Sequence, residues 1–199
     1  VHTLQRLGVK FGADLNAQTG FENTTYNIQS QVSDETLKDV FLVLRDYAGG
    51  VKFDENETQK EKGVILEEAK KGFERRFYEK RATYLYPNSI FSRRFPIGQN
   101  EIIKGATGEQ LKKFYARNYL PSAISIIVVG DVNIEQIKNL IKQNFSSLSA
   151  HGEKIPRDLS LHPFEGGLAS TVEPELGANV ASVLYAGKYE PLRSYGALK

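Results

Sequence analysis

A periodic run of apolar positions between residues 33 and 50 predicts an amphipathic helix. The apolar residues recur at the i, i+3, i+4 and i+7 spacing of a single helix face: Leu37, Val40, Phe41, Leu44, Tyr47 and Ala48. Ser33 precedes the run as a candidate N-cap, and two acidic residues follow it in the first turn. The pair Gly49-Gly50 is typical of a helix end, so we expect the helix to stop there.

A second helical pattern follows, and it predicts one continuous helix over residues 54–77. Asp54 is placed to cap this helix, and Glu57 completes a capping-box pattern three residues later. Apolar residues then recur about once per turn: Val64, Ile65, Ala69, Phe73 and Phe77. The helix is therefore expected to bury one face.

Two glutamates interrupt this apolar face. Glu68 lies about 40° from Val64 and about 60° from Ile65 around the helix axis, and Glu61 lies two turns earlier on the same stripe. An ionised carboxylate that leaves water costs several kcal/mol unless a cation meets it. The pattern therefore indicates a metal site or buried pairs with Arg or Lys. The alternative is a solvated surface, because glutamates and lysines also alternate at i,i+4 spacing nearby.

Alternation of apolar and polar side chains predicts a β-hairpin near the start of the chain. Thr24, Tyr26 and Ile28 alternate with more polar neighbours, as in a strand with one buried face. We expect residues 13–18 to form a shorter strand paired with it and residues 19–23 to form the turn. Residues 3–7 have the pattern of the last turns of a helix that ends at a glycine.

The second half of the chain predicts two further helices around an apolar strand. Thr107 and Gln110 form a capping box that opens a helix closed by Pro121. Residues 123–130, AISIIVVG, are typical of a strand buried on both faces. A helix is expected after Asn133, with a face of Ile134, Ile137, Leu140, Ile141 and Phe145.

Composition and charge exclude several kinds of site. The 199 residues contain no cysteine, which rules out a disulfide framework, a thiolate zinc site and a cysteine nucleophile in this chain. A net charge of +2 gives little support for nucleic-acid binding, and the basic, aromatic stretch over residues 75–81 is the last-ranked alternative. No apolar run approaches the roughly 20 residues of a membrane-spanning helix.

Four sequence blocks, in order, resemble the pitrilysin or insulinase family of zinc peptidases, family M16. The blocks are residues 7–28 (LGVKFGADLNAQTGFENTTYNI), 61–72 (EKGVILEEAKKG), 95–121 (FPIGQNEIIKGATGEQLKKFYARNYLP) and 126–132 (IIVVGDV). They are similar to the bacterial processing proteases and the mitochondrial processing peptidases of that family. The tail from residue 172 resembles the opening of the family's second, homologous domain.

The resemblance implies an α+β fold with a mixed or antiparallel sheet packed against helices. It divides the chain into a first peptidase-like domain over residues 1–150, a linker over residues 151–168, and the beginning of a second similar domain over residues 169–199. The Ser-, Gly- and Pro-rich composition of residues 146–167 agrees with a linker.

The resemblance also implies a zinc site and a peptide site. In the family, two histidines of an inverted H-x-x-E-H motif and one downstream glutamate hold Zn²⁺, and the motif's glutamate is the general base. The family's pair of glutamates falls on Glu68, as the metal ligand, and on Glu61, as a supporting carboxylate. The adjacent Glu67, which points about 100° away from Glu68, is the alternative ligand. The substrate would lie extended beside the strand formed by Leu15, Asn16, Ala17 and Gln18. Without the resemblance, that strand reads as one arm of an ordinary hairpin.

The sequence departs from the family pattern in one respect. It contains no H-x-x-E-H motif, and its three histidines, His2, His151 and His162, form no ligand pair. We expect the chain to be a fragment of a zinc endopeptidase whose motif lies upstream, inactive on its own because two ligands and the base are missing. The alternative is a non-catalytic subunit or scaffold that grips peptides beside an active partner.

The resemblance further implies partners and a compartment. The expected partners are a peptide or unfolded protein substrate and a second half or homologous subunit of the same family. The bacterial character of the match favours the periplasm or cell envelope, with an organellar matrix as the other possibility.

Overall fold

A computed structural model describes residues 8–10, 12–71 and 73–148. The chain separates into two compact units, residues 1–71 with 94–158 and residues 72–93 with 159–199. The predicted helix end at residues 3–7, the linker at 151–168 and the strand-like tail from residue 169 all lie outside the described residues.

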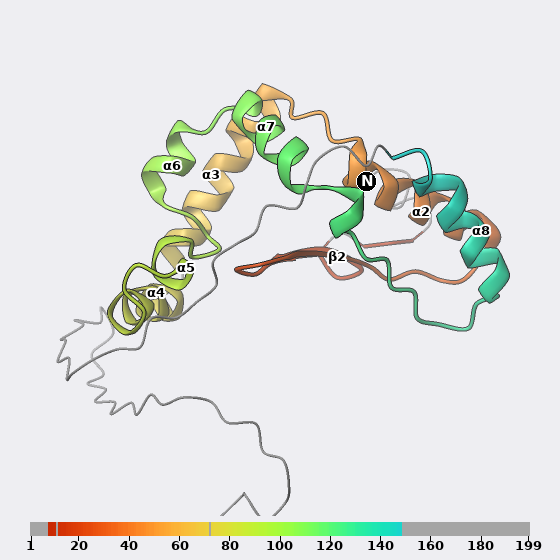
Figure 1. The fold of residues 1–199 in the computed structure, drawn as a ribbon, viewed down its shortest axis with the longest axis horizontal. Coiled ribbons are helices and arrows are strands. Elements are labelled where there is room, and N and C mark those ends of the chain that lie inside the picture. The colour runs from red at the N-terminus through yellow and green to blue at the C-terminus, as the bar shows by residue number, and fades with distance from the viewer. Residues whose placement is uncertain (1–7, 11, 72, 149–199) are drawn as a thin grey trace, which may run out of the picture. The chain divides into compact units, whose positions relative to one another are not determined.

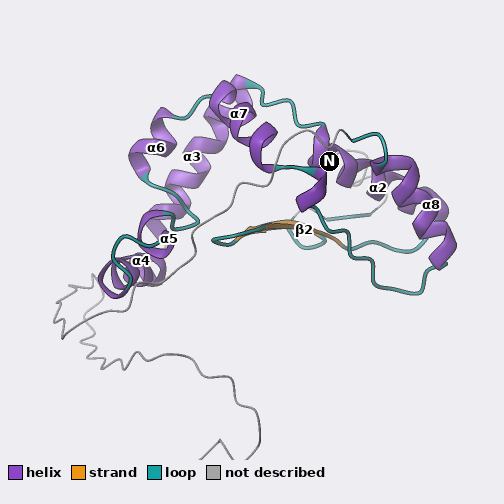
Figure 2. Ribbon diagram, viewed as in Figure 1, coloured by secondary structure: helices purple, strands orange, loops and turns teal. Residues whose placement is uncertain are grey.

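The described residues form an α+β fold, rich in helix with a small antiparallel sheet, as the sequence predicted (Figures 1 and 2). The first unit contains the strands β1 (Leu15–Thr19) and β2 (Thr24–Ile28), the α-helices α2 (Asp34–Gly49), α3 (Glu55–Lys71), α6 (Asn100–Gly105), α7 (Gly108–Asn118) and α8 (Ile134–Phe145), and a 3-10 turn at Pro121–Ala123. The second contains α4 (Phe73–Leu85) and α5 (Ile90–Arg93). None of the helices described is long and apolar enough to cross a membrane.

Helix α2 forms the centre of the first unit because it buries two faces. Its cap is confirmed, since the Ser33 hydroxyl accepts the Thr36 N–H at 3.1 Å. One face places Leu37 and Phe41 against Ile137 and Leu140 of α8, and Phe41 is only 1% exposed. The other face packs against the hairpin through Val40, together with Leu15 and Val9. The predicted helix and its apolar face are both confirmed.

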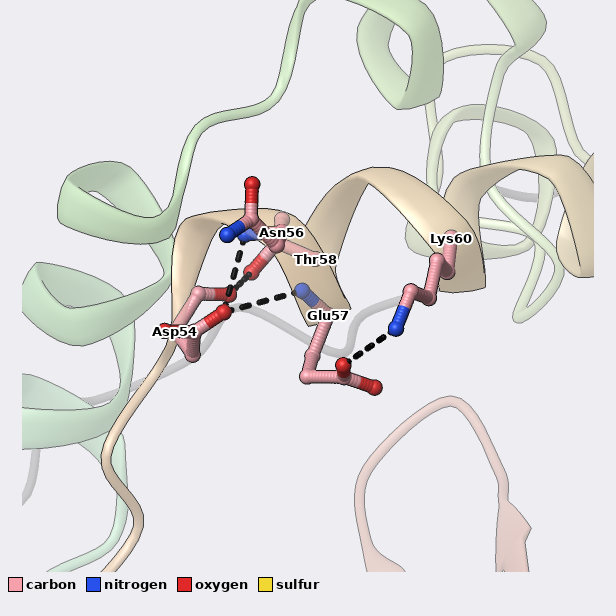
Figure 3. Close-up of polar contacts among 5 residues, drawn as sticks. All are labelled: Asp54, Asn56, Glu57, Thr58 and Lys60. Atoms are coloured by element: carbon pink, nitrogen blue, oxygen red, sulfur yellow. Dashed lines mark hydrogen bonds and ion pairs between the residues drawn. The ribbon is translucent and has the colours of Figure 1, made fainter.

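Asp54 caps α3 as predicted (Figure 3). One of its carboxylate oxygens accepts the backbone N–H groups of Asn56 and Glu57, at 2.9 and 3.1 Å. Its backbone carbonyl accepts the Thr58 hydroxyl at 2.8 Å. The Glu57 carboxylate forms an ion pair with Lys60 at 2.6 Å on the exposed surface. The sequence thus located the start of this helix correctly.

The first two turns of α3 are joined to the segment between α6 and α7. A Glu55 carboxylate oxygen accepts the Gly108 N–H at 2.7 Å, and Lys62 donates to the Ala106 carbonyl at 2.8 Å. Hydrogen bonds from the Gln59 side chain and from Gly108 lower the pKa of Glu55 below its ordinary value. Thr107 and Gln110 complete the predicted capping box of α7.

The prediction of an interior strand at residues 123–130 is wrong. Residues 124–129 form no strand, and Ile127 and Val129 are 85% and 92% exposed. A strand buried on both faces needs covering layers and a hydrogen-bonded neighbour, but the only sheet in the described part of the chain consists of β1 and β2. Within the range 54–77 predicted as helix, the structure describes helix on both sides of residue 72, as α3 up to Lys71 and as α4 from Phe73, and residue 72 itself lies outside the described residues.

The second unit contains a helix pair, α4 and α5, joined by a turn at Pro87 and Asn88. Asn88 has a positive φ of 62°, a conformation that asparagine tolerates better than most residues. Ser89 is buried, and its hydroxyl donates to the Tyr86 carbonyl at 2.6 Å. The turn therefore uses its own side chains to satisfy backbone groups between α4 and α5.

Replacement of Gly108 by alanine is expected to destabilise the protein. A Cβ atom at this position would lie 2.6 Å from the Phe53 carbonyl oxygen and 3.0 Å from a Glu55 carboxylate oxygen, so backbone would have to shift. The expected loss in free energy of unfolding is about 1–3 kcal/mol. Gly63→Ala is the matched control, because nothing lies within 4 Å of its Cβ position and helix propensity favours alanine by about 0.5–1 kcal/mol. Denaturant titration of both variants measures the difference; equal stability would contradict the close approach at Gly108.

Loss of the Asp54 side chain is expected to weaken the start of α3. Asp54→Ala leaves the Asn56 and Glu57 N–H groups without their acceptor and should lower the free energy of unfolding by about 1 kcal/mol. Asp54→Asn retains an acceptor oxygen and should remain within a few tenths of a kcal/mol of the parent. Urea denaturation followed by circular dichroism compares the two, and an alanine variant as stable as the asparagine variant would rule out a stabilising cap.

Candidate functional site

The strand β1 presents one edge without a β-strand partner in the described part of the chain. It pairs with β2 on the other edge, with Leu15 opposite Ile28 and Ala17 opposite Tyr26. Only Leu15 of its five residues is buried. The predicted peptide-binding residues Leu15, Asn16, Ala17 and Gln18 are thus brought together on one short strand.

The alternation of hydrogen-bonded and non-hydrogen-bonded pairs in the hairpin shows which backbone groups of β1 point to its unpaired edge. The Gln29 N–H donates to the Asp14 carbonyl at 2.7 Å, and the Gly20 N–H donates to the Asn23 carbonyl at 2.8 Å. Hydrogen-bonded and non-hydrogen-bonded pairs alternate along an antiparallel ladder. The two bonds above lie at opposite ends of the hairpin, and both indicate that the even-numbered residues of β1 are the ones hydrogen-bonded to β2. The N–H and C=O groups of Leu15, Ala17 and Thr19 therefore point away from β2.

Some of these outward groups already have partners within the chain. Leu15 donates its N–H to the Lys10 carbonyl at 3.2 Å and accepts the Gly12 N–H at 3.0 Å. The Asn16 side-chain oxygen accepts the Ala17 N–H at 2.8 Å. A local side-chain acceptor of this kind saturates an exposed edge and is easily exchanged for another. The section of the edge at Ala17 and Thr19 is therefore the part accessible to an added strand.

Four tyrosines in contact with one another connect β2 to helices α2 and α7. The hydroxyls of Tyr26 and Tyr119 lie 2.8 Å apart, and the Tyr26 ring stacks on that of Tyr47 at 4.8 Å. Tyr115 stacks on Tyr119 at 4.5 Å and donates its hydroxyl to the Tyr47 carbonyl at 2.6 Å. We call Tyr26, Tyr47, Tyr115 and Tyr119 the tyrosine cluster.

Burial raises the pKa of three tyrosines in this cluster. Desolvation, followed by the hydrogen bond to Tyr119, raises the pKa of Tyr26, and burial also raises the pKa of Tyr47 and of Tyr115. Sequence reasoning identified Tyr26 and Tyr47 only as apolar positions on their elements. The Tyr26–Tyr119 contact spans 93 positions in the chain, so no local pattern could have revealed it.

The two candidate zinc-site glutamates lie on α3, and the structure contradicts their expected burial. Glu61 and Glu68 are both exposed, and Val64, expected beside them in a buried face, is 60% exposed. Glu67 forms an ion pair with Lys70 at 2.6 Å on the neighbouring surface. The alternative of a solvated face is therefore the better description of this part of α3.

The residues described do not by themselves form a zinc site. Seven residues of α-helix correspond to a rise of about 10.5 Å, so Glu61 and Glu68 are too far apart to share an ion directly without large side-chain excursions. Among these residues, no three His, Cys, Asp or Glu side chains gather as a possible metal site. Glu68 supplies at most one of the three or four protein ligands that zinc takes.

Comparison with sequence models of protein families gives two matches to one peptidase family. Residues 2–85 match the model described as "Insulinase (Peptidase family M16)", and residues 105–198 match "Peptidase M16 inactive domain". The matches cover both ends of the described region and extend beyond it.

Individual relatives agree with the family matches. The chain is 32% identical over 149 residues to a probable zinc protease PqqL of Haemophilus influenzae, covering 73% of this chain and 16% of the relative. It is 30% identical over 177 residues to the chloroplastic stromal processing peptidase of Arabidopsis thaliana, covering 85% of this chain and 14% of the relative. The chain thus spans about one sixth or less of these curated relatives.

A solved structure shares the fold. The first half of the periplasmic protease PqqL from Escherichia coli matches with a TM-score of 0.74 and 30% identity, over 81% of this chain and 35% of that one. Family matches at both ends, named zinc proteases among the relatives and a shared fold lead to the same assignment: the chain belongs to the insulinase family of metallopeptidases, family M16.

Proposed function

We propose that this chain is the peptide-gripping part of a zinc-dependent endopeptidase that hydrolyses extended peptides or unfolded segments laid along β1. The observation that carries the proposal is the exposed β1 edge, with the outward backbone groups of Ala17 and Thr19 accessible. Addition of a strand to such an edge supplies main-chain hydrogen bonds that tolerate many peptide sequences. A processing peptidase among the relatives supports a polypeptide substrate for this chain.

The same proposal assigns a metal-site role to α3. Glu68 would supply one ligand to Zn²⁺, and Glu61 would support it from two turns away. The sequence block at residues 61–72 that resembles the family supports this role, together with the zinc proteases named among the relatives. The histidines and the general base implied by the H-x-x-E-H motif are not among the 199 residues, so the full site requires further polypeptide.

A second candidate is a non-catalytic subunit that binds peptides on the same edge beside an active partner. The match of residues 105–198 to a domain described as inactive favours this alternative. Both candidates use a second half or homologous subunit as partner. A periplasmic location is proposed by analogy with the E. coli relative, and an organellar matrix by analogy with the chloroplast enzyme.

Zinc content distinguishes the two candidates. In the longest natural polypeptide that carries this sequence, the endopeptidase proposal predicts about one zinc ion per chain, with a loss of tenfold or more in zinc affinity in Glu68→Gln. Glu67→Gln is the matched control, because Glu67 pairs with Lys70 on a different side of the helix and should leave zinc binding unchanged. Metal analysis after dialysis measures both variants. No zinc in the parent protein would sink the endopeptidase and favour the non-catalytic subunit.

Proline substitutions in β1 test directly whether a peptide binds along its unpaired edge. Ala17→Pro removes an N–H that points away from β2, so the fold should tolerate it while affinity for an added strand falls roughly twofold to tenfold, the effect of one hydrogen bond. Gln18→Pro removes an N–H that bonds to β2 and should unfold the hairpin instead. Fluorescence anisotropy with a labelled Ala- and Ser-rich peptide, after zinc removal by a chelator, measures the affinity. Full affinity in Ala17→Pro would show that the peptide binds elsewhere.

A further inference from the structure

Beyond Leu15, which is buried against α2, the position of β1 depends on its pairing with β2. Four of the five β1 residues are exposed, and the strand makes its regular backbone bonds to β2 alone among the described residues. An edge that receives a peptide must hold its backbone groups in fixed positions, because hydrogen bonds weaken steeply with poor alignment. Whatever fixes β2 therefore fixes the peptide-binding edge.

Among the described residues, the hairpin contacts the rest of its unit at its base, its tip and its middle. At the base, Leu15 and Ile28 join the apolar cluster of α2. At the tip, Phe21 meets Phe95 edge to face, with ring centroids 5.7 Å apart. The middle is held by Tyr26, which lies directly opposite Ala17 in the register.

The middle attachment differs from the other two because it is directional. Apolar packing at the base and the single ring contact at the tip resist separation but only weakly resist sliding along the strand axis. The Tyr26 ring stacked on Tyr47 has the same property. The hydrogen bond between the Tyr26 and Tyr119 hydroxyls, at 2.8 Å, fixes the strand relative to the end of α7.

We propose that Tyr26 and Tyr119 are positioning residues that, through their paired hydroxyls, hold β2 and thereby set the β1 edge for an extended peptide. The inference rests on the proposed function, since it requires β1 to be the peptide-binding strand. Neither tyrosine needs to touch the peptide. They act indirectly: by fixing β2 at Tyr26, they fix the position of Ala17, which lies opposite Tyr26 on β1 and in the accessible section of the edge.

The test compares Tyr26→Phe, Tyr119→Phe and the double variant in the longest natural polypeptide. Each phenylalanine keeps its ring and removes one hydroxyl. Each single variant should weaken binding of the labelled Ala- and Ser-rich peptide about threefold to tenfold, and the double variant should be no weaker than either single one, because one bond is lost in all three. Hydrogen exchange should accelerate severalfold over residues 15–28 in each.

Tyr115→Phe is the matched control from the same cluster. It removes the hydroxyl bond to the Tyr47 carbonyl, which joins α7 to α2 without touching β2. It should lower stability while leaving hairpin exchange and peptide affinity close to the parent. Equal losses of affinity in Tyr115→Phe and Tyr26→Phe would overturn the inference in favour of general destabilisation, and unchanged hairpin exchange in Tyr26→Phe would overturn it as well.

A third outcome distinguishes failure of this inference from failure of the proposed function. If exchange accelerates in Tyr26→Phe but peptide affinity does not change, Ala17→Pro decides. A loss of affinity in Ala17→Pro leaves β1 as the peptide strand and overturns the role of the tyrosines. Unchanged affinity in Ala17→Pro removes β1 as the peptide strand, so the proposed function fails first.

Discussion

The antiparallel pairing of β1 with β2 is the interaction on which the candidate site depends. A two-stranded ribbon is marginal in water, so this hairpin exists because α2 packs behind it. Helix α2 in turn is held from its other side by α8, through Phe41 and Leu140. The helix pair α2 and α8 therefore supports β2, and β2 supports the exposed strand β1. The mostly exposed strand β1 is thus the last in this sequence of supports.

The sequence predicted well those features that local chemistry decides. Caps at Ser33, Asp54 and Thr107 were placed correctly, because each cap is a contact between residues two or three positions apart. The apolar face of α2 was equally readable from its period. The hairpin and its turn followed from alternation around Tyr26. These interactions lie within a few residues of each other, where a single sequence contains all the information.

The errors have a common physical origin, which is that burial is decided by distant parts of the chain. The run at residues 123–130 is apolar enough for an interior strand, yet Ile127 and Val129 are exposed, and no strand in the described part of the chain pairs with them. The predicted burial of the α3 face around Glu68 is wrong for the same reason, since periodicity shows which residues share a side of a helix but not what covers that side. The Tyr26–Tyr119 contact was missed because nothing near either residue indicates the other.

The junction between α3 and α7 has a consequence for the geometry of Glu68. Glu55 and Lys62 hold the first two turns of α3, and Gly108 allows the backbones to approach closely there. Glu68 lies 13 residues beyond Glu55, about 20 Å along the axis. The helix therefore behaves as a lever: a tilt of about 5° at the junction displaces Glu68 by nearly 2 Å. That displacement is on the order of a zinc–oxygen bond. Gly108, which lies beside the first turn of α3, can thus govern where the carboxylate of the proposed zinc ligand lies.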